Sequence, residues 1–241
     1  MKRALLLLLT AISSGLAVWL WLPNDPNETL VVRQIQKNLE TVVVINVKTV
    51  VPMIEIKRYG NGHALEISTK AVSVSGAGVY ISSRGSVLTC EHLFFGDIQE
   101  ITATDYYGNS WELDLLGRSL RQDLALLRSE ARNVRYARVE WPGRTKVGQE
   151  VWAIGHPFGL TYTVTKGIVS ATNRDQYRYN MTQFDVAINP GNSGGPVFNR
   201  AGNIVGIVSG HISENRSWSG ITMTTSVEQI REFLVRFRRG L

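Results

Sequence analysis

The chain has 241 residues, 44% hydrophobic and 19% charged, a balance that excludes a disordered polypeptide and permits a sizeable core. Its net charge of +6 is spread along the chain, apart from a C-terminal cluster at 231–239 that we interpret as a solvated helix face. We therefore predict no nucleic-acid partner, although a tail that touches anionic lipid or nucleic acid is the alternative. A single cysteine, Cys90, excludes an intramolecular disulfide, and without metal-ligand spacings we expect no metal or cofactor.

The first segment, residues 1–23, has the pattern of a targeting sequence. Lys2 and Arg3 precede the apolar stretch 4–22, as in an export signal. Gly15 and Ala17 are the small residues that a cleavage site needs at its −3 and −1 positions, whereas the length of the stretch nearly spans a bilayer. We expect a signal peptide or a transmembrane anchor and favour the uncleaved anchor. The following domain would then lie on the extracytoplasmic (periplasmic) side of the membrane.

Residues 24–40 are expected to form a linker and a short helix. Pro23 and Pro26 mark the linker, and Thr29 is placed to cap a helix whose apolar residues include Leu30 and Leu39.

From residue 41 onward, short strands alternate with turn signals. The sequence Gly60-Asn61-Gly62 between 54–59 and 64–74 predicts a β-hairpin. Further strands are predicted at 41–47, 78–82, 86–89, 111–116, 124–128, 151–154, 162–171, 182–188, 196–198 and 204–209. This spacing indicates antiparallel barrels rather than a parallel sheet with crossover helices.

The C-terminus returns to a helical pattern. Ser226 and Gln229 form a capping-box pair, and apolar residues recur on one face of a helix predicted at about 226–238. The fold class is therefore all-β, with residues 41–241 forming one domain of two β-barrels and a C-terminal helix.

The sharpest local signal is the segment 189–196, Asn-Pro-Gly-Asn-Ser-Gly-Gly-Pro. Glycines on both sides of Ser193 allow a tight turn in which the amides of Gly191 and Ser193 converge on one point. Such a point can bind the oxyanion that forms during acyl transfer. The alternative is an ordinary glycine-rich turn.

A serine hydroxyl needs a base to remove its proton. Among the four histidines, His92 follows the predicted buried strand 86–89, at the point where the strand ends. His63, His156 and His211 lack this placement. The alternative for His92 is a structural role, which is the commoner one for a single histidine.

The base in turn needs a carboxylate that orients it. Asp123 stands directly before the apolar run 124–127, while Asp185, the next candidate, lies only eight residues before Ser193. Asp123 as an ordinary strand-start residue is the alternative.

The chain order His92, Asp123, Ser193 is typical of chymotrypsin-like peptidases, which place the cleft between two barrels. Ala187, six residues before Ser193, corresponds to the base of the specificity pocket and predicts small or medium aliphatic P1 residues. Ser209 is a second candidate for substrate contact.

The chain resembles the HtrA/Deg family of serine proteases in several collinear blocks, at 75–79, 88–92, 123–127, 153–159, 165–170 and 188–196. The resemblance implies a double barrel that cleaves unfolded or damaged polypeptides. It assigns His92, Asp123 and Ser193 as the catalytic triad, and Gly191 and Ser193 as oxyanion donors.

Two features depart from the family. Cys90 replaces the usual asparagine and is expected to pack as a small buried residue. The PDZ domain that usually follows the protease is not expected here. A homotrimer is the assembly that the resemblance implies. A protease-fold binding protein or chaperone without proteolytic activity remains the alternative function.

Overall fold

The computed structural model describes residues 30–59, 62–175, 180–211 and 220–237. The predicted leader 1–23 and the predicted cap Thr29 lie outside these residues. Within them, no helix combines the length and the apolar character needed to cross a bilayer.

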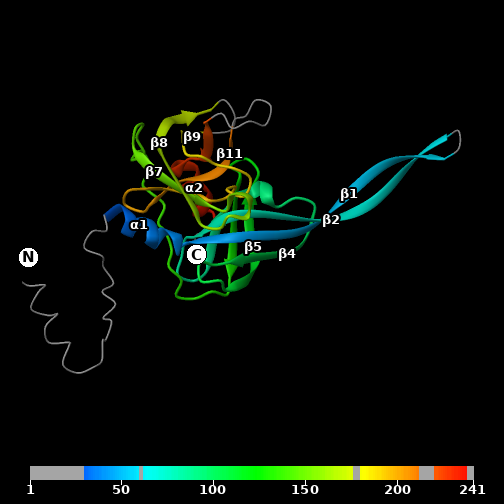
Figure 1. Ribbon diagram of the computed structural model, residues 1–241, viewed down its shortest axis with the longest axis horizontal. Helices are drawn as coiled ribbons and strands as arrows, with labels where there is room; N and C mark the ends of the chain where they lie inside the picture. Colours follow the sequence, from blue (N-terminus) through cyan, green and yellow to red (C-terminus); the bar gives the residue numbers. More distant parts are fainter. Residues whose placement is uncertain (1–29, 60–61, 176–179, 212–219, 238–241) are drawn as a thin grey trace, which may run out of the picture.

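Two closed antiparallel barrels are assembled from the described strands (Figure 1). The first has the order β1-β2-β3-β6-β5-β4 and comprises β1 (Val42–Tyr59), β2 (Gly62–Tyr80), β3 (Ser86–Thr89), β4 (Asp97–Thr104), β5 (Ser110–Ser119) and β6 (Leu124–Ser129). The second has the order β10-β11-β12-β9-β8-β7 and comprises β7 (Glu150–Gly155), β8 (Thr163–Arg174), β9 (Met181–Phe184), β10 (Pro196–Asn199), β11 (Ile204–His211) and β12 (Thr222–Thr225).

Each barrel has its own apolar interior because alternate residues of its strands point inward. Val43, Ile45 and Val47 of β1 are fully buried inside the first barrel, and Val197 and Val205 are buried inside the second. A third cluster lies between the barrels and beneath the helices. It consists of Leu39, Val42, Val79, Leu88, Leu124, Leu126, Ala137, Ile154, Phe198, Ile204, Ile207, Ile230 and Phe233.

Helices α1 (Leu30–Leu39) and α2 (Val227–Val235) flank the barrels, and two 3-10 turns, η1 (Glu91–Leu93) and η2 (Pro157–Gly159), follow β3 and β7. Ser226 caps α2 by accepting a hydrogen bond from the Gln229 amide, as the capping-box pair predicts. Buried Phe233 attaches α2 to the inter-barrel core.

The predicted fold class, an all-β double barrel with a C-terminal helix, is confirmed. The predicted hairpin is also confirmed, because β1 and β2 pair from Val42 to Tyr59, although Gly60 and Asn61 lie outside the described residues. Strands β4 and β12 are additional to the prediction.

Candidate active site

His92 lies in η1, where the chain leaves the buried strand β3. Its side chain is 39% exposed, whereas the preceding Cys90 is fully buried. This position fixes the backbone of His92 on the first barrel and leaves its imidazole open to the solvent.

Asp123 lies directly before β6 and is 2% exposed. Its φ of 52° is in the left-handed region that aspartate and asparagine adopt more readily than other non-glycine residues. The preceding residue, Gln122, is held by β12 and α2, because its backbone carbonyl accepts from Thr225 Oγ1 (2.8 Å) and its side-chain Nε2 donates to the Gln229 carbonyl (3.2 Å). The residue before the carboxylate is therefore held by a strand of the second barrel and by the C-terminal helix.

The Asp123 carboxylate is surrounded by hydrogen-bond donors. Oδ1 accepts from the amides of Glu91 (3.1 Å) and His92 (3.0 Å), and Oδ2 lies 2.9 Å from His92 Nδ1. The Ser209 hydroxyl donates to the same Oδ2. These contacts hold the imidazole with Nδ1 toward the acid, so that Nε2, the nitrogen that exchanges the proton in a catalytic triad, points away from it.

The charge of Asp123 is stabilised in spite of its burial. Burial by itself raises the pKa of this carboxyl, but hydrogen bonds and charge attraction from His92, together with the Ser209 hydroxyl, hold the pKa below its ordinary value. The group is therefore ionised at neutral pH and can stabilise an imidazolium.

Ser193 lies in the turn that precedes β10, in the second barrel. Gly191 and Gly194 have φ of 104° and 80°, where a side chain would be strained. A Cβ on Gly194 would lie 2.3 Å from the Ala77 carbonyl, and one on Gly191 would lie 2.2 Å from the His156 carbonyl. The turn therefore requires glycine at both positions.

Backbone hydrogen bonds attach this turn to both barrels, to β2 of the first and to β11 of the second. The Ala77 amide of β2 donates to the Ser193 carbonyl (2.8 Å), and the Gly194 amide donates to the Val208 carbonyl (2.8 Å). By contrast, the amides of Gly191 and Ser193 donate to no residue that the structure describes. They are the two donors that the sequence predicts for an oxyanion.

His92 and Asp123 are thus in contact, whereas no hydrogen bond joins Ser193 Oγ to His92 among the described residues. Nε2 instead contacts Cys90 Sγ at 3.6 Å. Burial, followed by the nearby charge of Asp123, raises the pKa of the Cys90 thiol well above its ordinary value, so the thiol is neutral. Cys90 is buried as expected, but its contact with the imidazole was not foreseen from the sequence.

The two predicted substrate contacts differ in their surroundings. Ala187 is half-buried, and its carbonyl accepts from Thr165 Oγ1 at 3.0 Å. The Ser209 hydroxyl is engaged by Asp123. Because that contact joins residues 86 positions apart, no local pattern could reveal it.

The other histidines do not compete for the role of base. His156 is buried, and burial lowers its pKa to about 4, so the imidazole is neutral at pH 7 and its Nδ1 accepts from the Tyr162 amide at 3.0 Å. The side chains of His63 and His211 lie outside the described part of the chain. Nowhere in that part do three metal-ligating side chains gather.

Known proteins are similar to this chain in sequence and in architecture. Residues 76–207, more than half of the chain, match the family model described as a trypsin-like peptidase domain. A probable periplasmic serine endoprotease, DegP-like, from Pseudomonas putida (strain GB-1) is 41% identical over 157 residues, which are 64% of this chain and 32% of that protein. A protein of the same description from Marinomonas sp. (strain MWYL1) is 43% identical over 151 residues, which are 61% of this chain and 32% of that protein. The chain thus spans about a third of the length of these relatives.

Solved structures agree with the sequence comparison. A variant of the HtrA-type protease AlgW with a decapeptide has a TM-score of 0.78 at 25% identity, covering 88% of this chain and 68% of that chain. AlgW with a tripeptide has a TM-score of 0.73 at 27% identity, covering 86% of this chain and 62% of that chain. The HtrA/Deg resemblance is confirmed, and the chain belongs to the family of trypsin-like peptidase domains.

Proposed function

We propose that this chain is a serine endopeptidase that hydrolyses unfolded or damaged polypeptides with the triad His92, Asp123 and Ser193. The observation that supports this most strongly is the pairing of His92 Nδ1 with the buried, ionised Asp123. The turn that carries Ser193 belongs to the second barrel and is joined to β2 of the first barrel through the Ala77 amide.

In the proposed reaction, His92 Nε2 takes the proton from Ser193 Oγ as this oxygen bonds to the scissile carbonyl carbon. The amides of Gly191 and Ser193 stabilise the resulting oxyanion. The imidazolium then gives its proton to the leaving amine, and the peptide bond breaks. Water attacks the acyl-enzyme through the same base, which releases the acid and restores the hydroxyl. For the first step Nε2 must exchange its contact with Cys90 for one with Ser193.

Small uncharged Ala187 supports a preference for small or medium aliphatic P1 residues. A panel of peptides that differ only at P1 tests this preference. Cleavage mainly after Lys or Arg would contradict it.

The relatives named as periplasmic support an extracytoplasmic location for this chain. We further propose that residues 1–23 direct export or anchor the chain in the membrane, with Lys2 and Arg3 on the cytoplasmic side. A homotrimer is the proposed assembly, by resemblance to the family.

A non-proteolytic binding protein is the second candidate, and the contact between Nε2 and Cys90 favours it. Labelling of the purified full chain by a fluorophosphonate probe, together with casein digestion, separates the two functions. We expect the wild type to be labelled and to digest casein, and Ser193→Ala to do neither. An unlabelled wild type that leaves casein intact would reject the peptidase.

A further inference from the structure

Strands β1 and β2 extend far beyond the barrel that they help to form (Figure 1). β1 pairs with β4 only as far as Val50, and β2 pairs with β3 only at its last two residues. Residues 51–59 and 62–70, here called the β-arm, therefore form a two-stranded ribbon with no other described strand beside it. An isolated ribbon of this kind buries little of its own surface.

One face of the β-arm is apolar and exposed. Ile54 lies opposite Ile67, and Ile56 lies opposite Leu65. Because directly opposed residues share a face, all four side chains point to the same side. Their exposed fractions are 68%, 74%, 70% and 71% in that order.

The other face of the β-arm is charged. Glu55 lies opposite Glu66, and Lys57 pairs with Glu66. The ribbon is therefore amphipathic, although neither face is covered by any other described part of the chain.

The apolar face is not an extension of the barrel core. Within the barrel the odd-numbered residues of β1, Val43 and Val47 among them, point inward. In the β-arm the even-numbered Ile54 and Ile56 are apolar, while the odd-numbered Glu55 is charged. Because successive side chains of a strand point to opposite faces, the apolar residues of β1 lie on one face in the barrel and on the other face in the β-arm.

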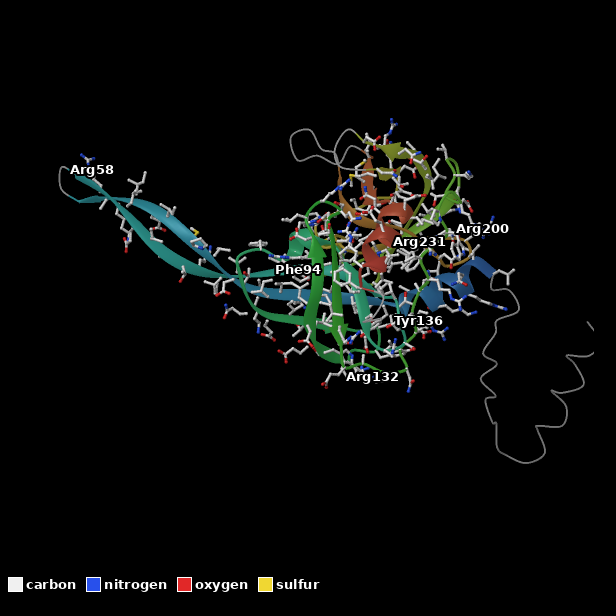
Figure 2. The ribbon with its side chains drawn as sticks, turned by 180° about the vertical axis from the view of Figure 1, so that it is seen from behind. Arg58, Phe94, Arg132, Tyr136, Arg200 and Arg231 are labelled. Carbon is white, nitrogen blue, oxygen red and sulfur yellow. The ribbon has the colours of Figure 1, made fainter. Side chains whose placement is uncertain are left out.

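The end of the β-arm at the barrel, next to Thr49 and Val50 and here called its root, lies beside the loop that follows His92. Thr49 Oγ1 donates to the carbonyls of Phe95 (2.6 Å) and Asp97 (3.1 Å), and a Cβ on Gly96 would lie 2.6 Å from the Val50 carbonyl. In Figure 2, Phe94 lies near the root of the arm and Arg58 near its free end. A chain bound along the arm would thus be held next to the segment that carries the imidazole.

The area of the apolar face of the β-arm indicates which kind of partner the face can bind. Four exposed aliphatic side chains form a patch of a few hundred Å², whereas a stable pair of subunits buries about 800 Å² on each partner. The patch is too small for a stable dimer through this face alone. It fits an extended chain, which can also hydrogen-bond to the open backbone edges of the ribbon.

We propose that the apolar face of the β-arm binds apolar, extended segments of the polypeptide substrate. This inference rests on the proposed function, because a substrate is its occupant. Binding favours an unfolded chain, since folded proteins protect their edge strands and expose few contiguous apolar side chains.

Binding is tested apart from turnover in the full chain carrying Ser193→Ala, with fluorescein-labelled casein and fluorescence anisotropy. The arm variant combines Ile54→Thr with Ile67→Thr, which keeps β-branched side chains but makes the pair polar. The matched control combines Glu55→Thr with Glu66→Thr on the opposite face. We expect Kd for casein to rise about tenfold or more in the arm variant and to stay within about twofold in the control.

A direct probe covers the case in which the double variant fails to fold. Ile56→Cys and Lys57→Cys, each labelled with an environment-sensitive dye, place the dye on the apolar and on the charged face. Cys90 is fully buried, so labelling is confined to the new thiol. We expect casein to shift the emission to the blue for the dye at residue 56 but not at residue 57.

An equal Kd in the two double variants, or no difference between the two dyes, would overturn the inference. It would also be overturned if the arm variant changed only the sedimentation coefficient of the protein, or only its binding to anionic phospholipid vesicles. Casein digestion by the wild type decides the proposed function separately.

Discussion

The two sides of the candidate active site, one on each barrel, hold their functional groups by different means. On the first barrel, side-chain hydrogen bonds position the acid and the imidazole, since Asp123 is contacted by His92, Ser209 and two backbone amides. On the second barrel the hydroxyl of Ser193 has no hydrogen-bond partner among the described residues, and the backbone of a glycine turn determines its place.

Each side should therefore tolerate a different kind of substitution. The first side depends on charge and donor geometry, so it should be sensitive to isosteric changes that remove a charge. The second depends on space for the backbone, so it should be sensitive to one added methyl group.

The largest effect is expected from Asp123→Asn. Asparagine is nearly isosteric and tolerates the positive φ of this residue, so the fold should survive. It cannot stabilise an imidazolium as a carboxylate does, and kcat should fall about 10⁴-fold with little change in KM. Steady-state kinetics on a peptide substrate measure this, and full activity would move the role to another acid.

The second side is tested by Gly191→Ala. The new Cβ would lie 2.2 Å from the His156 carbonyl and would displace the amides proposed to bind the oxyanion. Loss of such a donor lowers kcat by about 10²–10³-fold. Gly143→Ala is the matched control, because Gly143 also has positive φ but has no atom within 4 Å of the added Cβ. Equal losses in both variants would attribute the effect to backbone strain alone.

His156, beneath the serine turn, should make the stability of the protein depend on pH. Burial lowers the pKa of its imidazole from 6.5 to about 4. As the pH falls below about 6.5, the unfolded chain takes up this proton before the folded protein does, so stability decreases toward pH 4. The shift corresponds to about 3 kcal/mol in the free energy of unfolding.

His156→Asn removes this titration while an amide oxygen can still accept from the Tyr162 amide. Urea unfolding at pH 7 and pH 4.5 should show a smaller loss of stability in the variant than in the wild type. An identical loss in the two proteins would show that His156 contributes nothing to the acid sensitivity.

The features that the sequence predicts are those marked by a local pattern of residues. His92, Asp123 and Ser193 each carry a local mark: the end of a buried strand, an acid before an apolar run, and flanking glycines. The structure places the first two in contact, while the catalytic roles of all three stay predictions. The hairpin and the C-terminal helix are equally local, which is why their patterns predict them.

Features that depend on distant partners are the ones that the sequence conceals. Strand β4 alternates weakly and is defined by its pairing with β1 and β5, and the Ser209 contact with Asp123 joins different barrels. The contact between Cys90 and His92 is close in sequence, but it depends on the way in which η1 turns the two side chains toward each other.

The smallest effect is expected from Ser209→Ala, which separates two roles for this residue. The hydroxyl is one of the groups that lower the pKa of Asp123, so its loss should raise that pKa and weaken the orientation of His92. One hydrogen bond to a charged group contributes about 1.5–3 kcal/mol, and its partial replacement by water should limit the fall in kcat to about tenfold. KM should stay unchanged if Ser209 acts through Asp123, whereas a raised KM with unchanged kcat would indicate the substrate contact predicted from the sequence. Ser209→Thr keeps the hydroxyl on a strand, where β-branched residues are favoured. Its kcat should stay close to that of the wild type if the loss in Ser209→Ala comes from the missing hydrogen bond to Asp123.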